Sequence, residues 1–192
     1  MPRLKTNTST CSVARALELL GDRWSFLLIR EVIFGTRRFD DFAAHLGIAR
    51  NVLAGMLAAL VDAGILEQRP LHQDARRLGY HLTEMGDGLL PALVALLQWG
   101  DRWLQTPDTV PLRIVERTTG AELPAVALLG TEGKPLTRRE LDWMPGPGAG
   151  HPGIAPLVAA YEKQRRVVPR PIPPAPTSTT ASPRPTTKGK PR

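Results

Sequence analysis

Residues 37–83 decide the fold of this chain, and they read RRFDDFAAHLGIARNVLAGMLAALVDAGILEQRPLHQDARRLGYHLT. Apolar residues at helical spacing predict a short helix over 39–46, which Gly47 ends, and a longer helix over 49–63. Residues 65–83 then read as a β-hairpin with a polar tip. Two helices joined by a tight turn and followed by a hairpin predict a winged helix-turn-helix.

The helix over 49–63 has one face of small side chains. Its buried side is predicted to hold Val52, Leu53, Met56, Leu57, Leu60 and Val61. The opposite side presents Asn51, Gly55, Ala58 and Asp62, with Arg50 and Ala54 at its edges. Such a helix fits the major groove of DNA, while the hairpin reaches along the backbone. A winged fold that contacts only other proteins is the alternative.

The residues expected to contact DNA lie before the motif, on its second helix and at the hairpin tip. Asn51 can pair with adenine, and Arg50 can pair with guanine or a phosphate. Because other long polar groups are few, we expect phosphates and the hairpin to supply much of the affinity. The two arginines before the motif could equally be solvated loop residues. The full set is Arg37, Arg38, Arg50, Asn51, Ala54, Gly55, His72, Gln73, Arg76 and Arg77.

Three further helices are predicted around this motif. The first runs over 12–20 with Ser12 as its N-cap, and the second, over 22–34, is apolar on most sides and should be the buried centre. The third runs over 83–104 and should bend near Pro91. It has more apolar surface than one core can bury, so we expect a homodimer seam; packing within one chain is the alternative. The expected interface residues are Leu89, Leu93, Leu96, Leu97, Trp99 and Trp103.

Charge and composition constrain the location of the protein and its partners. The net charge is +7, and residues 161–192 alone hold eight Lys and Arg against one Glu, so the folded part is nearly neutral. The single cysteine, Cys11, excludes an intramolecular disulfide. No stretch approaches the roughly 20 apolar residues of a membrane span, and residues 1–11 lack a secretory apolar segment. We therefore expect a cytoplasmic protein with no membrane partner.

The expected fold class is mainly α, with a small β component. The predicted order along the chain is a flexible N-terminus over 1–10, a DNA-binding and dimerisation domain over 11–104, a small β-hairpin-like extension over 107–144, a linker with one short helix over 145–160, and a disordered basic Pro-rich tail over 161–192. The short helix is expected at 155–166, and the apolar runs at 112–115 and 126–129 are the expected strands of the extension.

Over residues 11–104 the chain resembles the HxlR-type transcriptional regulators. The motifs that carry this resemblance occur together and in order: CSVARAL at 11–17, LGDRW at 20–24, LIRE at 28–31, RFDDF at 38–42, AGIL at 63–66, YHLTEMG at 80–86 and LPAL at 90–93. The resemblance implies a dimeric regulator that binds pseudo-palindromic double-stranded DNA, with the helix over 49–63 as recognition helix and residues 66–83 as wing.

The resemblance also implies a candidate sensor at Cys11, since several members of that family respond to thiol-reactive compounds through a cysteine at this position. A helix N-terminus and Arg15 one turn later would favour the required thiolate. Simple packing of a small cysteine beside the first helix is the alternative.

Two departures from the family pattern limit what is expected. Ala49, Ala54, Gly55 and Ala58 stand where many members carry polar residues on the recognition helix. The extension resembles zinc-binding extensions of some members, but it has no cysteine, so no metal or cofactor is expected. The chain also lacks a nucleophile motif, a phosphate loop and a catalytic constellation, so an enzyme is not expected.

Overall fold

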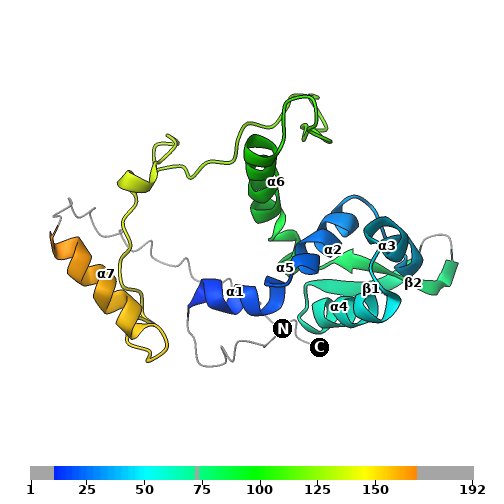
Figure 1. Ribbon diagram of the computed structural model, residues 1–192, viewed down its shortest axis with the longest axis horizontal. Helices are drawn as coiled ribbons and strands as arrows, with labels where there is room; N and C mark the ends of the chain where they lie inside the picture. Colours follow the sequence, from blue (N-terminus) through cyan, green and yellow to red (C-terminus); the bar gives the residue numbers. More distant parts are fainter. Residues whose placement is uncertain (1–10, 72–73, 168–192) are drawn as a thin grey trace, which may run out of the picture.

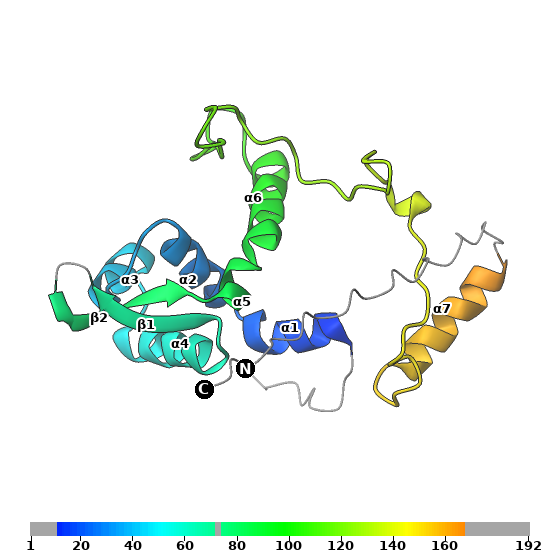
Figure 2. The same ribbon diagram turned by 180° about the vertical axis from the view of Figure 1, so that it is seen from behind.

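The computed structural model describes residues 11–71 and 74–167 (Figures 1 and 2). In chain order its elements are α1 (Ser12–Leu20), α2 (Arg23–Ile33), α3 (Phe39–Leu46), α4 (Arg50–Asp62), β1 (Leu66–Leu71), β2 (Asp74–Leu82), α5 (Glu84–Asp87), α6 (Leu90–Leu104), the 3-10 turn η1 (Arg138–Glu140) and α7 (Ala155–Val167). The expected class, mainly helical with a small sheet in a winged helix-turn-helix, is confirmed.

The core lies between α2, α3, α4 and the two-stranded sheet. Leu28 and Ile29 of α2, Phe42 of α3 and Leu53 and Leu57 of α4 are fully buried there. As predicted, α2 is the central helix. Asp22 caps it by accepting hydrogen bonds from the backbone N–H groups of the first turn, so the predicted start of this helix is correct to one residue.

A glycine closes the turn between α3 and α4. Gly47 has φ 61°, a left-handed conformation that costs glycine little, and its N–H donates to the Ala43 carbonyl. Ile48 fills the corner between the two helices. Across this turn the chain bends by 119°, close to the angle typical of a helix-turn-helix.

Among the described residues, no single helix is long and apolar enough to span a membrane. The pair α3 and α4 has the required length and composition only when its two helices are taken together across the 119° bend, and this pair is the helix-turn-helix itself.

The wing is the antiparallel hairpin β1–β2, with Leu66 opposite Leu82 and Pro70 opposite Leu78. The hairpin is held to the helices through its second strand, β2, where the Tyr80 N–H donates to the Arg37 carbonyl at 3.0 Å. The Tyr80 ring also meets Phe42 edge-on, with ring centroids 5.8 Å apart. These contacts fix the hairpin relative to α3.

Thr83 connects the wing to the helices that follow it. Its Oγ1 donates to the Gly64 carbonyl at 2.6 Å, at the end of α4, and accepts from the Gly86 N–H at 3.1 Å, inside α5. The Thr83 N–H donates to the Ile65 carbonyl at 3.1 Å. One residue therefore joins the end of α4, the end of the wing and the start of α5.

The prediction of one bent helix over 83–104 is wrong. The structure has two helices, α5 and α6, separated at Gly88 and Leu89. Pro91 lies in the first turn of α6 and not in the middle of a helix. Backbone N–H groups in a first turn have no acceptor within the helix, so the N–H that proline lacks costs nothing there.

The N-cap of the first helix lies one residue before the predicted position. Cys11, and not Ser12, is the N-cap of α1, and its side chain makes no capping hydrogen bond. Gly21 ends α1 as expected, with its N–H on the Leu17 carbonyl.

The segment after α6 differs from the predicted hairpin. Residues 112–115 and 126–129 do not pair with each other; instead each closes its own turn, through isolated bridges between Val115 and Glu122 and between Leu129 and Pro135. The glycines at 120 and 133 take positive φ within these turns, so the chain reverses twice over short distances.

The predicted short helix at 155–166 is present as α7, but it continues to Val167. It therefore runs into the segment that we expected to be a disordered tail from residue 161, because the residues up to Val167 still favour helix and the first proline follows at 169. The remaining tail, 168–192, and the N-terminal segment, 1–10, lie outside the described residues.

Candidate nucleic-acid interface

The exposed face of α4 begins with two long polar residues and continues with small ones. Arg50 and Asn51 lie in its first turn, and Ala54, Gly55 and Ala58 follow on the exposed side. A Cβ added to Gly55 would meet no atom within 4 Å, so no other described part of the chain covers this position. The face is narrow, and a flat or grooved surface can approach it closely.

Val52 is the one residue of α4 whose predicted burial is wrong. It is 43% exposed, whereas Leu53 and Leu57 on the same helix are fully buried. The core beneath α4 is filled by these leucines, so Val52 is left at the edge of the exposed face.

The guanidinium of Arg50 is held by α3 in the free protein. Its Nη1 lies 2.8 Å from Asp40 Oδ1, and its Cζ lies 4.8 Å from the centre of the Phe39 ring. Because both charged side chains are 68% exposed, the ion pair contributes only about 0 to 1 kcal/mol. Arg50 is therefore oriented beside the N-terminal end of α4 but can be released at little cost.

The N-terminal end of α4 has no side-chain cap. Ala49 occupies the N-cap position, where Ser, Thr, Asp or Asn would accept a hydrogen bond from the first turn. The N–H groups of that turn therefore point out of the helix without a side-chain acceptor from residue 49.

The two arginines that precede α3 differ in their environments. Arg37 is half-buried, and its Nη1 donates to the carbonyls of Val32, at 2.5 Å, and Thr36, at 3.0 Å. These bonds close the C-terminal end of α2, so the side chain supports the fold instead of extending toward solvent. Arg38 is exposed at the N-cap position of α3.

The predicted contacts of the hairpin are only partly visible. His72 and Gln73 lie outside the described residues. The backbone of Arg76 lies in β2, where its side chain is not described, and Arg77 follows it as an exposed residue.

A buried polar cluster fixes the helix-turn-helix to α2. Glu31 is buried, and its Oε2 accepts from the Thr36 hydroxyl at 2.9 Å and lies 2.8 Å from His45 Nδ1. Its Oε1 accepts from Arg30 at 2.8 Å. Burial alone would raise the pKa of the Glu31 carboxyl, but the hydrogen bonds from His45, Arg30 and Thr36 outweigh burial, and the pKa is lowered. The carboxylate is therefore ionised where α3 joins α2.

The six residues predicted for a dimer seam do not share one environment. Leu93 is buried within the chain and Leu89 packs partly against the core, so these two residues already have contacts in the single chain. Leu96, Trp99 and Trp103 are exposed, and Leu97 is half-buried.

Sequence reasoning missed a second exposed apolar surface, on α1. Val13, Leu17 and Leu19 are exposed, with Leu17 at 56%. Only Leu20 of this helix is buried.

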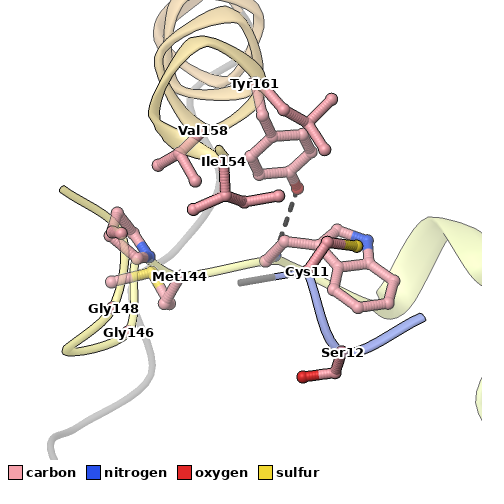
Figure 3. A pocket seen from close by; sticks show the side chains of 12 residues that line it. Cys11, Ser12, Met144, Gly146, Gly148, Ile154, Val158 and Tyr161 are labelled. Atoms are coloured by element: carbon pink, nitrogen blue, oxygen red, sulfur yellow. Dashed lines mark hydrogen bonds between the residues drawn. The ribbon is translucent and has the colours of Figure 1, made fainter. Parts of the chain in front are cut away.

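Cys11 lines an apolar cavity of about 550 Å³ between the start of α1 and the C-terminal part of the chain. Figure 3 shows Cys11 and Ser12 across from Ile154, Val158 and Tyr161, with Met144 beside them. The Tyr161 hydroxyl donates to Asp142 Oδ1 at 2.8 Å and accepts from the Trp143 N–H at 3.1 Å, which ties α7 to the segment before it.

Within residues 11–71 and 74–167, no group of three or more His, Cys, Asp or Glu side chains is placed to hold a metal ion.

The helix-turn-helix, the wing and the open face of α4 together define a winged-helix protein of the kind that reads DNA. The model of the family described as HxlR-like helix-turn-helix matches residues 19–108. Over 137 residues the chain is 41% identical to the HTH-type transcriptional regulator Rv3095 of Mycobacterium tuberculosis. This alignment covers 71% of this chain and 87% of that protein. Over 105 residues it is 30% identical to the HTH-type transcriptional regulator YodB of Bacillus subtilis. This alignment covers 54% of this chain and 94% of YodB. The chain belongs to the HxlR family of DNA-binding transcriptional regulators.

Two solved structures support the fold. PA1607, a candidate transcription factor, is 35% identical with a TM-score of 0.68, covering 73% of this chain and 99% of its own. PA1374 of Pseudomonas aeruginosa, also a candidate transcription factor, is 34% identical with a TM-score of 0.52, covering 76% and 99%. Both matches cover more of the chain than residues 19–108, so the likeness includes part of the segment after α6. The relatives are named as transcriptional regulators and the two solved chains as candidate transcription factors.

Proposed function

We propose that this chain is a sequence-specific transcriptional regulator that acts in the cytoplasm as a homodimer on pseudo-palindromic operators. The observation that carries the proposal is the open face of α4, which has Arg50 and Asn51 at its N-terminal end and only small side chains behind them. In a dimer, two such helices enter successive major grooves on one side of the duplex.

The N-terminal end of α4 is the part that approaches the bases. Asn51 pairs with adenine, and Arg50 leaves Asp40 to pair with a guanine or a phosphate. The N–H groups of the uncapped first turn donate to a backbone phosphate, which a helix N-terminus favours. Ala54 and Gly55 permit close contact with DNA but contribute little to distinguishing one base from another.

Phosphate contacts supply most of the remaining affinity. Arg38 at the start of α3 and Arg76 and Arg77 on the wing are the candidates, whereas Arg37 is left out because its guanidinium closes the end of α2. His72 and Gln73 at the hairpin tip remain predicted contacts. Such contacts position the protein on DNA without choosing its sequence.

The homodimer is supported by the apolar surfaces on α1 and α6. Leu17, Trp99 and Trp103 are all more than half exposed, and exposed apolar surface of this kind marks a site of interaction. A two-fold axis through these helices buries the same surface on both copies and spaces two copies of α4 along the DNA.

A thiol-reactive or small-molecule signal is proposed to act at Cys11. The thiol lies at the N-cap of α1, next to the proposed seam, and it faces the 550 Å³ cavity. A modification there changes the packing of α1 and hence the pairing of the two copies. Reaction with a maleimide probe should alter DNA affinity in the wild type and leave the Cys11→Ser variant unchanged.

A winged-helix module that contacts only proteins is the second candidate. It is favoured by the Ala-rich and Gly-rich face of α4 and by the ion pair that holds Arg50 in the free chain. Such a module shows no salt-dependent affinity for DNA.

Fluorescence anisotropy tests the proposal. The full chain is titrated against DNA from upstream of its own gene and against a scrambled duplex, at two salt concentrations. We expect tighter binding to the upstream DNA and an affinity that falls steeply with salt. Equal binding to both duplexes would rule out sequence-specific recognition of DNA. Absence of binding by a folded dimer would favour the protein-interaction module.

A further inference from the structure

The segment after α6 is long but has no core of its own. From position 94 to position 164, all of it described, not one residue is buried. Large apolar side chains are open along its whole length, with Leu128 61% and Leu157 64% exposed. Ordering a residue costs about 1 to 2 kcal/mol of backbone entropy, so a segment of this length needs another surface to cover it.

The path of the segment leads from one proposed dimer helix to the other. Gln98 of α6 holds its first part, donating to the Pro124 carbonyl at 3.1 Å and accepting from the Val126 N–H at 2.7 Å. The last part returns to α1, where residues 143–161 line the cavity that Cys11 also lines. Figures 1 and 2 show this arc from α6 to α7 beside α1 in both views.

We propose that residues 107–161 form a dimerisation arm that lies against α1 and α6 of a second copy of this chain. The inference rests on the proposed homodimer and extends its interface. The arm starts beside α6, where Gln98 holds it, and ends beside α1, where it lines the cavity with Cys11, so a second copy seated on the open faces of α1 and α6 also meets the open apolar side chains of the arm.

A second copy fits this surface better than a nucleic acid or an acidic or basic protein. Residues 107–160 carry five basic and six acidic side chains, which gives no charge for a strongly charged partner to recognise. By two-fold symmetry, the arm of each copy covers the helices of the other, and both arms are buried at once. The likeness to PA1607 also reaches into this segment, as expected for a shared structural element.

Sedimentation equilibrium of full-length variants tests the arm. Leu128→Asp and Leu157→Asp each place a charge on an arm residue that is exposed in the protomer, so neither should unfold it. We expect each variant to raise the monomer–dimer dissociation constant at least tenfold. Thr131→Asp, at an exposed position of the neighbouring turn, is the matched control and should leave that constant within twofold of the wild type.

Trp103→Asp on α6 distinguishes the contribution of the arm to the dimer from the contribution of the dimer seam on α6. If Trp103→Asp dissociates the dimer while both arm variants remain as dimeric as the wild type, the arm inference is wrong and the homodimer stands. If the wild type is itself monomeric, the homodimer and the arm both fail.

A photo-crosslinking residue at position 128 gives a second readout that unfolding cannot mimic. In a mixture of tagged and untagged chains, we expect crosslinks from the arm of one copy to α1 or α6 of the other. Crosslinks confined to a single chain overturn the arm even if dimer affinity changes.

Discussion

Glu31 Oε2 lies 2.8 Å from His45 Nδ1, and this contact joins the central helix α2 to the first helix of the helix-turn-helix. The Thr36 hydroxyl bonds the same oxygen at 2.9 Å from the loop between the two helices. The angle of α3, and through the Gly47 turn that of α4, therefore depends on one buried carboxylate.

Glu31→Gln is expected to lower the free energy of unfolding by about 1 to 3 kcal/mol at pH 7, because charge-assisted hydrogen bonds are lost in a buried place. The pKa of Glu31 is lowered in the folded protein, so its contribution is complete above its ordinary pKa and is lost as the pH falls through the folded value. The difference between variant and wild type should shrink below about pH 4. Urea unfolding at several pH values measures it.

Glu67→Gln is the control for this experiment. Glu67 pairs with Arg69 on the exposed wing, and its loss should cost no more than about 0.5 kcal/mol. An equal loss in both variants, or a Glu31→Gln effect that does not depend on pH, contradicts the prediction.

Gly86→Ala is expected to destabilise the fold strongly, whereas Gly55→Ala should stabilise it. A Cβ on Gly86 would lie 2.3 Å from the Ile65 carbonyl oxygen, which belongs to the backbone and cannot move aside easily, so we expect a loss of about 1 to 3 kcal/mol or more. Gly55 lies in α4 with open space around it, so alanine should add about 0.5 to 1 kcal/mol through helix propensity. Thermal unfolding of the two variants should move in opposite directions; a shift of the same sign would refute the argument.

Arg50→Ala and Asn51→Ala are expected to reduce the preference for operator over scrambled DNA by about 1 to 3 kcal/mol each. The reason is that base contacts discriminate, while phosphate contacts do not. Asp40→Asn is the informative companion, because it frees Arg50 without removing it and should raise affinity for both duplexes. Anisotropy titrations supply both values, and an unchanged preference in Arg50→Ala would remove this residue from base recognition.

Replacing Arg76 and Arg77 together by alanine is expected to weaken binding to every sequence and to flatten the salt dependence. Each lost phosphate contact should reduce the slope of log affinity against log salt by about 0.9, so two contacts reduce it by nearly 2. Titrations at four salt concentrations give the slope. If the slope stays the same, the wing does not contact phosphates through these arginines.

Local spacing was enough to predict the DNA-reading half of the molecule. Phe42 and Leu53 lie in the core because their neighbours at helical spacing are also apolar, and Gly47 ends α3 because a left-handed residue is needed there. Asp40, which holds Arg50, could not be found in this way, because the pair joins two helices across a turn.

The errors occur where the chain depends on distant contacts. Val52 was predicted to lie on the buried side of α4 but is 43% exposed, and Leu93, predicted for a dimer interface, is already buried within its own chain. An amphipathic pattern shows that a face must be covered, but it does not identify what covers it. The extension was predicted as one hairpin from its apolar runs, yet each run closes its own turn, because strand pairing depends on partners that β propensity does not specify.

The hydroxyl of Thr83 gives the molecule a mechanical property that neither helix has alone. Since it bonds the end of α4 through Gly64 and the start of α5 through Gly86, the recognition helix and the segment leading to α6 share one pivot with little slack. The position of α4 is therefore tied to the helices that follow the wing, and not only to the contacts that α4 itself makes with the core.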